Sequence, residues 1–248
     1  MKLDRKLVEK PWGVDTLPDW LGGGDGRRIG EIWFDGGQDM PVPLLVKYIH
    51  TSEKLSVQVH PNDADAQARG LSKGKNEGWY IVSAEPGATL GIGTKAVLSD
   101  EELRAAALDG SIEDDLVWHK ARVGDWFYVP AGTVHAIGPG VGLIEVQPNV
   151  DITYRLYDYG RPRALHLDDG VAVADARPYD GDHHISAAAS NSRELPAGGG
   201  FRIWSWTGSL EGADFGTGPW FCIPLDGEMT VDGECIVRGE CAMTERLG

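Results

Sequence analysis

The sequence predicts a mainly β protein, an antiparallel sandwich or barrel with a few short helices and a smaller C-terminal β region. Short runs of strand-forming residues follow one another along the chain, and Gly, Pro, Asn and Asp separate them. The 34 glycines and 14 prolines among 248 residues indicate many turns. Before residue 180 the predicted strands are 43–49, 55–60, 78–83, 88–93, 126–130, 142–147 and 152–159.

Two short surface helices are predicted from their capping residues. The alanine-rich segment 64–69 follows Asn62, which can cap it, and Gly70 ends it. Residues 103–108 follow Ser-Asp-Glu-Glu at 99–102, which has the spacing of a capping box. Neither helix is long enough to build a helical bundle.

The composition changes after residue 180. Segment 182–200 is small and polar, so we expect a loop or linker. Asp226-Gly227 and Asp232-Gly233 are predicted hairpin turns. The predicted strands here are 201–206, 220–225, 228–231 and 234–237, and they contain no histidine. We therefore divide the chain into a catalytic domain, 1–180, and a linker with a metal-free C-terminal β region, 181–248, which can be a reduced second barrel.

Charge and composition exclude several classes of partner. The net charge of -15 argues against nucleic acids and anionic membranes. The charged N-terminal segment predicts no signal peptide, and the absence of an 18-residue apolar stretch predicts no transmembrane helix. The three cysteines are odd in number and lack metal-knuckle spacing, which favours free thiols in the cytoplasm. We expect a cytoplasmic protein, and a monomer is favoured.

Segment 55–60 carries the first chemical signal. Its apolar residues alternate with Ser56, Gln58 and His60, so a strand projects these three side chains from one face. An ordinary strand with a solvated polar face explains this segment equally well. A second histidine, His135, ends the segment 124–135 and favours a functional site over an ordinary strand.

These two segments together resemble the cupin superfamily. In 124–135, Gly, five residues, Pro, one residue, Gly, two residues and His match the second cupin motif. The first motif usually has His where Gln58 stands, so a divalent metal bound here would need an anionic ligand in addition. The best candidate is Glu77, whose alternative is a solvated loop carboxylate. Two nitrogens and two oxygens suit one Zn²⁺ with an open position, and the predicted ligands are Gln58, His60, Glu77 and His135.

Four ordered blocks resemble a narrower family, type I mannose-6-phosphate isomerase in its short bacterial form. The similarity runs from about residue 8 to residue 168 and is weak after 180. The blocks are 55–63, 74–81, 128–137 and 145–161, with further similarity at 10–13, 29–33 and 165–168.

The resemblance implies roles for ten residues. It implies zinc on the four ligands named above and places Arg155 in the active site. Glu145 and Asp151 match acidic residues proposed for acid–base work, and Ser56, Lys75 and Arg161 match positions thought to hold phosphate. Other interpretations stay open: an orienting group for Glu145, a turn former for Asp151, a surface ion pair for Arg155, and ordinary surface roles for Lys75 and Arg161.

The implied activity is the interconversion of mannose 6-phosphate and fructose 6-phosphate through a cis-enediol. Zinc would stabilise negative charge on the substrate oxygens, and Arg155, always charged, would stabilise oxyanions rather than carry protons. The alternatives are isomerisation of another sugar or sugar phosphate, or a non-catalytic sugar-binding cupin. Nothing in their spacing recruits the other histidines, including His50, and we expect them to be structural.

Overall fold

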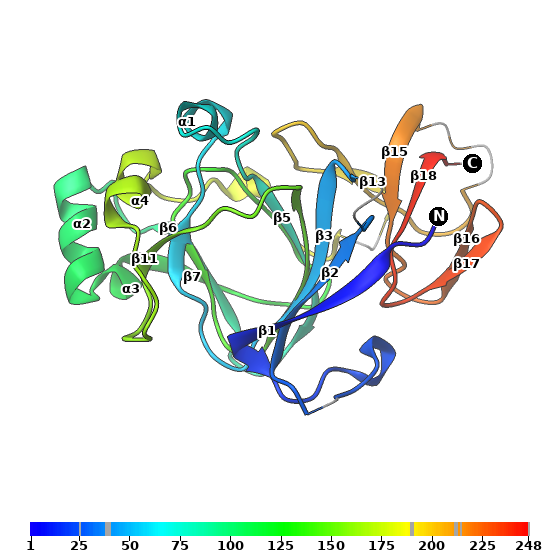
Figure 1. Cartoon of the computed structure of the whole chain (residues 1–248), viewed down its shortest axis with the longest axis horizontal. Helices are drawn as coiled ribbons and strands as arrows, with labels where there is room; N and C mark the ends of the chain where they lie inside the picture. The colour runs from blue at the N-terminus through cyan, green and yellow to red at the C-terminus, as the bar shows by residue number, and fades with distance from the viewer. Residues whose placement is uncertain (25, 38–40, 189–190, 211–212, 214, 248) are drawn as a thin grey trace.

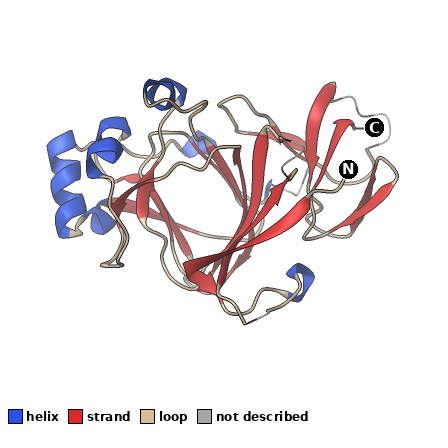
Figure 2. Ribbon diagram, viewed as in Figure 1, coloured by secondary structure: helices blue, strands red, loops and turns tan. Residues whose placement is uncertain are grey.

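The computed structural model describes residues 1–24, 26–37, 41–188, 191–210, 213 and 215–247. Two antiparallel sheets dominate it, so the predicted mainly β class is confirmed (Figures 1 and 2). The larger sheet contains, in spatial order, β1 (Asp4–Val14), β2 (Ile29–Asp35), β3 (Leu44–His50), β10 (Val141–Pro148), β5 (Glu77–Ala84), β8 (Trp126–Val129) and β12 (His184–Ile185). The second contains β11 (Tyr154–Tyr157), β4 (Val57–Val59), β9 (His135–Ile137), β6 (Thr89–Thr94) and β7 (Leu116–Lys120).

The inner faces of these two sheets form the central core. Trp79 and Ile81 of β5 pack in one cluster with Leu90 and Ile92 of β6, and all four are buried. Burial of such large apolar side chains is the main favourable contribution to the stability of the barrel.

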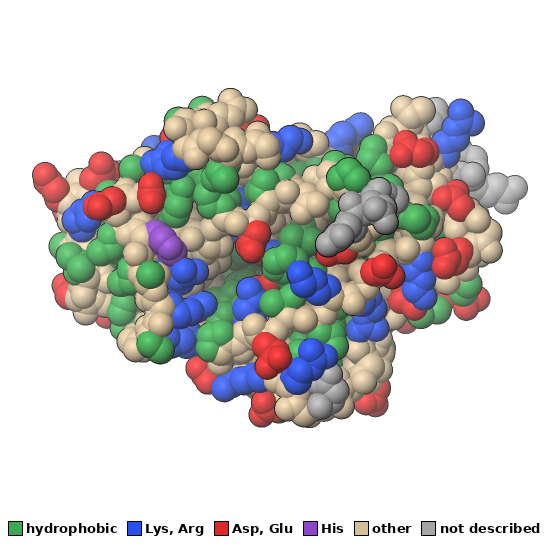
Figure 3. All heavy atoms as spheres, viewed as in Figure 1, with side chains coloured by type: hydrophobic (Ala, Val, Ile, Leu, Met, Phe, Trp, Pro, Cys, Tyr) green, Lys and Arg blue, Asp and Glu red, His purple; other side chains and the backbone are tan. Residues whose placement is uncertain are grey.

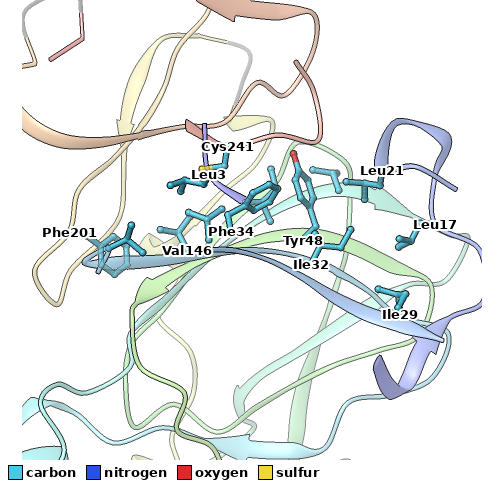
Figure 4. Packing of buried hydrophobic residues seen from close by; sticks show 14 of the residues in the cluster. Leu3, Leu17, Leu21, Ile29, Ile32, Phe34, Tyr48, Val146, Phe201 and Cys241 are labelled. Carbon is cyan, nitrogen blue, oxygen red and sulfur yellow. The ribbon is translucent and has the colours of Figure 1, made fainter. Parts of the chain in front are cut away.

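Each sheet also buries its outer face. The helices α2 (Asp100–Asp109), α3 (Ile112–Asp115) and α4 (Leu167–Val173) cover the five-stranded sheet, seen at the left of Figure 1. On the outer face of the seven-stranded sheet, Tyr48 and Val146 pack with Phe201 and Cys241 from the C-terminal region (Figure 4). The barrel is therefore buried on both sides.

The seven strands predicted before residue 180 are all present, with shifted ends. The largest changes are in segments 152–159 and 55–60, which are strands only over Tyr154–Tyr157 and Val57–Val59. Strand β1 was not predicted because it is charged, contains Pro11 and has no clear alternation. It lies at the edge of the sheet, where charged residues and proline are tolerated.

Both predicted helices are confirmed. In α1 (Asp63–Ala68) the Asn62 side chain accepts a hydrogen bond from the backbone N–H of Asp65 at 3.0 Å. In α2 the Ser99–Glu102 capping box is complete. Helix α4 was missed because it contains Gly170, a weak helix former. A Cβ at Gly170 would lie 2.6 Å from Leu156 Cδ2, so glycine permits the close packing of α4 on β11.

In the C-terminal region, one of the two predicted hairpins is confirmed and the other is wrong. Asp232 and Gly233 both have positive φ and join a hairpin, as predicted. The hairpin predicted at Asp226-Gly227 is wrong, because the preceding strand pairs with the last strand of the chain. The strands here are β13 (Arg193–Leu195), β14 (Ile203–Ser205), β15 (Thr217–Cys222), β16 (Glu228–Val231), β17 (Glu234–Val237) and β18 (Ala242–Arg246).

Segment 182–200 is not a simple linker. His184 and Ile185 pair with β8, and β13 pairs with β14. Residues 189 and 190 of this segment lie outside the described residues. Strand pairing depends on backbone hydrogen bonds, so these strands form although their sequence has little apolar alternation. The chain termini also meet, since Leu3 N–H donates to Cys241 O at 2.8 Å.

The short connecting elements complete the fold. These are the 3₁₀ turns η1 (Asp19–Leu21) and η2 (Gly181–His183). Among the described residues, every helix is too short or too polar to cross a membrane.

Candidate metal centre and active site

Three of the four predicted metal ligands lie together between the two sheets. Glu77 begins β5 of one sheet, His135 begins β9 of the other, and His60 follows β4. All three side chains are buried, and one ligand atom from each lies within 4.8 Å of the others. The backbone explains the meeting, because Gly132 N–H donates to His60 O at 2.8 Å and so holds the turn before His135 against His60.

The fourth predicted ligand, Gln58, lies next to this group. It is paired with His135 across β4 and β9, and its Nε2 lies 3.3 Å from His135 Nε2. Ser56 Oγ donates to its Oε1 at 3.1 Å. The two amide atoms are exchangeable by rotation, so the oxygen can be turned toward the histidine side.

The chemistry of these atoms fits a bound cation. Both ring nitrogens of His60 and both carboxylate oxygens of Glu77 are buried without a hydrogen bond of acceptable geometry. Glu77 Oε1 lies 3.1 Å from His60 Nε2 and 3.0 Å from Lys75 Nζ, so its near neighbours are a ring nitrogen and an ammonium group. Unsatisfied buried polar atoms are rare and call for an explanation, and a metal ion supplies one.

Protonation states at neutral pH agree with that interpretation. Burial lowers the pKa of His60 to about 3 and also lowers the pKa of His135. Burial acts to raise the pKa of Glu77, but the Lys75 ammonium and the two histidines outweigh it and hold that pKa well below its usual range. His135 Nδ1 contacts Thr133 O at 2.8 Å, which leaves Nε2 as the ligand atom. Neutral imidazoles with a carboxylate suit a divalent metal such as zinc.

A pocket opens beside the metal group, with Ser56 and Gln58 in its wall. Its charged residues are five cations and three carboxylates, an excess of positive charge in a protein of net charge -15. Lys and Arg side chains border a hollow on the face shown in Figure 3. The charged lining residues are Lys10, Lys47, Lys75, Arg155, Arg163, Glu31, Glu145 and Asp151.

Of the remaining predicted site residues, four line this pocket and one does not. Glu145, Asp151, Arg155 and Lys75 line this pocket. Arg161 does not line it. Its guanidinium bonds Asp158 and Glu53 and the carbonyl of Lys54 instead.

Arg163 lines the pocket two residues further along and was not selected from the sequence. It is fixed by two hydrogen bonds of 2.6 Å to the Asp158 carboxylate. Arg161 was selected because it matches a position that the family resemblance assigns to phosphate, and Arg163 had no such match. Spacing alone could not decide between them.

Lys75 lies deeper than a phosphate-binding role suggests. Its side chain is buried and its Nζ is 3.0 Å from Glu77 Oε1. The ammonium therefore holds Glu77, a predicted metal ligand, in its ionised form, and the lysine also lines the pocket.

Lys47 is a second residue that sequence reasoning missed. Its buried Nζ donates to Glu145 Oε1 at 2.8 Å and to Gln147 Oε1 at 2.6 Å. Trp79 Nε1 donates to the other oxygen of Glu145 at 3.2 Å. A lone lysine inside the apolar strand 44–50 was a usable signal, because buried lysines are rare unless they are paired.

The pKa values of both Glu145 and Lys47 are raised. Burial raises the pKa of Glu145, and the charge of Glu77 raises it further. Burial acts to lower the pKa of Lys47, but Glu145 and Glu31 outweigh it and raise that pKa. Lys47 therefore stays charged, and Glu145 is the carboxylate of the site whose proton affinity is increased.

Comparison with known proteins agrees with the family resemblance that the sequence shows. No protein-family model matches the chain. The mannose-6-phosphate isomerase of Streptococcus mutans is 41% identical over 146 residues, which are 56% of this chain and 46% of that protein. Mannose-6-phosphate isomerase ManA of Bacillus subtilis is 43% identical over 163 residues, 60% of this chain and 51% of that protein. The resemblance to mannose-6-phosphate isomerases is confirmed.

The solved structures show that the fold is shared as well. The crystal structure of the Bacillus subtilis mannose 6-phosphate isomerase superposes with a TM-score of 0.75 at 24% identity, over 97% of this chain and 91% of that one. The cupin fold expected from the motifs is therefore confirmed. In sequence, the chain spans about half the length of the curated mannose-6-phosphate isomerases that it matches.

Proposed function

We propose that this chain is a zinc-dependent aldose–ketose isomerase that interconverts mannose 6-phosphate and fructose 6-phosphate. One observation carries the proposal: a buried His60–Glu77–His135 group with unsatisfied ligand atoms adjoins a pocket with an excess of cations. A metal group alone would fit many cupins. The cationic wall inside an acidic protein favours an anionic sugar.

The phosphate group would be held at the arginine side of the pocket. Arg155 and Arg163 lie in the pocket wall, and guanidinium groups bind phosphate oxygens in pairs. The hydroxyl of Ser56, in the same wall, would be a further donor to phosphate once rotation of the Gln58 amide releases it. Arg161 is held by Asp158 and Glu53, so its contribution would be to support this wall.

Zinc would be held by His60, Glu77 and His135, with Gln58 as a fourth ligand after rotation of its amide. When bound, the ion supplies Lewis acidity toward the substrate oxygens. The Lys75 ammonium beside Glu77 keeps that carboxylate ionised and thus ready to bind a cation.

Proton transfer would be the task of Glu145. Isomerisation requires a base that takes the proton from C2 of the aldose and returns it to C1. Glu145 lies in the pocket wall, and its raised pKa brings it closer to neutral pH, where a base can also give the proton back. Lys47 and Trp79 fix the carboxylate, and Arg155 would stabilise negative charge on the enediolate. Asp151, exposed in the same pocket, is the alternative base.

A coupled assay with the purified chain tests this proposal. We expect turnover of mannose 6-phosphate that a chelator abolishes and added zinc restores, with little turnover of glucose 6-phosphate or free mannose. Turnover that survives metal removal would exclude the metal mechanism. Turnover on unphosphorylated mannose alone would exclude the arginine phosphate site. Binding of the sugar phosphate without turnover would favour the non-catalytic sugar-binding alternative.

We further infer that the protein works as a cytoplasmic monomer, with residues 1–180 as its catalytic unit. The free thiols of Cys222, Cys235 and Cys241 support a reducing compartment. Cell fractionation and the mass in solution test these points, and a periplasmic location or a stable dimer would contradict them.

A further inference from the structure

A second cavity lies on the opposite face of the seven-stranded sheet. Its volume is about 380 Å³, within the range of small-molecule sites. It lies where β1, β3 and β5 end and β10 begins. Glu77 of the metal group stands at the other end of β5, so the two sites are separated by the length of that strand.

Strand β3 shows that the sheet divides the two sites. Lys47 and Ile49 project into the active-site pocket. Tyr48 and His50 project from the other face, where the Trp20 ring contacts both, with centroids 5.3 and 6.2 Å away. Leu17 of the cavity wall packs in the same cluster as Tyr48, on the outer side of the sheet (Figure 4).

One buried polar atom in the cavity wall has no hydrogen-bond partner in the described part of the chain. His50 is 6% exposed, and its Nε2 is buried with no hydrogen bond. Burial lowers its pKa to about 4, so the ring is neutral at pH 7 and offers one acceptor and one donor. Ser83 Oγ lies close to this ring, because a Cβ on Gly142 would meet Ser83 Oγ at 2.1 Å and His50 Nδ1 at 2.9 Å.

The charge of the cavity differs from that of the active site. Neither lysine nor arginine lines it, and its one charged residue is Glu85. This carboxylate is exposed and forms no ion pair among the described residues. A phosphate would be repelled here, whereas a cation would be attracted both by Glu85 and by the overall negative charge of the protein.

We propose that this cavity binds a small hydroxylated primary ammonium compound, such as an amino sugar. Its ammonium group would pair with Glu85, and a hydroxyl group would bond Ser83, beside the neutral ring of His50. Its apolar face would lie on Val14, Leu17 and Pro18. The site is thus distinct in chemistry from the sugar-phosphate pocket and does not depend on the isomerase activity.

Titration calorimetry of the full chain with glucosamine tests the proposal, with N-acetylglucosamine and mannose as uncharged controls. We expect one glucosamine per chain and no binding of either control. Glu85→Gln should weaken binding about tenfold, the loss of one charge-assisted contact. Ser83→Ala should weaken it as well.

Arg155→Ala serves as the matched control, because that residue lines the other pocket, and it should bind glucosamine normally. Circular dichroism of each variant verifies folding. Absence of glucosamine binding at millimolar concentrations would overturn the proposal. So would equal affinity of Glu85→Gln, or loss of binding in Arg155→Ala, which would place the ligand in the active site. Failure of the isomerase assay would leave these outcomes unchanged, so the two proposals are judged separately.

Discussion

Lys47 and Glu145 stand directly opposite each other on β3 and β10, and the Lys47 ammonium bonds the Glu145 carboxylate at 2.8 Å. Both side chains are buried, so neither charge is stabilised by water. Cross-strand pairing thus places a desolvated ion pair in the wall of the active-site pocket.

The first prediction concerns the stability of this pair. Lys47→Met should lower the free energy of unfolding by about 3–5 kcal/mol, because it leaves Glu145 buried without its cation. The double variant Lys47→Met/Glu145→Leu should recover much of that loss, since both charges are removed. Urea denaturation of the three proteins measures this difference. A double variant less stable than the single one would contradict the interpretation.

The second prediction separates metal binding from catalysis. His135→Ala should abolish stoichiometric zinc, because it removes a buried ligand, whereas Arg155→Ala should retain zinc and lose turnover. Metal analysis of the dialysed proteins, together with the isomerase assay, measures both effects. Loss of zinc in the arginine variant would disprove this division of roles.

The third prediction compares the two neighbouring arginines. Arg163→Ala should raise KM for mannose 6-phosphate about tenfold, the effect of one lost charge-assisted contact to phosphate. Arg161→Ala should change KM less, since Arg161 bonds Glu53 and Asp158 outside the pocket lining. Steady-state kinetics of both variants measure these changes in KM. A larger rise in KM for Arg161→Ala than for Arg163→Ala would indicate that Arg161 binds the phosphate.

The fourth prediction concerns pH. The folded-state pKa of His50 is about 4, below its ordinary value of 6.5, so between these values the unfolded chain binds more protons. Stability from this group is therefore present above pH 6.5 and is lost as the pH falls toward 4. Between pH 7 and pH 5 the loss should be about 2 kcal/mol. His50→Gln should show a smaller loss over the same interval by chemical denaturation, and an equal loss would refute this assignment.

Proton transfer gives a fifth prediction. Glu145→Gln should lower kcat by at least about 100-fold if this carboxylate is the base, while Asp151→Asn should lower it far less. The amide keeps the shape of the side chain but leaves Lys47 without its carboxylate, so circular dichroism of the variant must verify folding before the kinetics are compared. The opposite order in the kinetics would make Asp151 the base.

Much of this site was accessible from local sequence. The alternation in 55–60 and the turn before His135 predicted the side chains that form the metal group, because strand periodicity and turn geometry depend only on neighbouring residues. The capping box of α2 and the Asp232-Gly233 hairpin were predictable for the same reason.

Other features depend on contacts between distant segments. Arg161 and Arg163 both bond Asp158, and only Arg161 also bonds Glu53 and the carbonyl of Lys54, whereas Arg163 lines the pocket. The pairing of β15 with β18 in place of β16 could not be read from turn residues, because strand partners are selected by the packing of the whole region.

For this protein, then, local patterning determined the β class, the caps of α1 and α2 and the identity of the predicted ligands. The folded chain decided which distant charged groups share a buried space, as Lys47 and Glu145 do. The physical reason is that hydrogen bonding and side-chain periodicity act over a few residues. Desolvation and Coulomb interactions are set by distances in space, which residues 98 positions apart in the chain acquire only on folding.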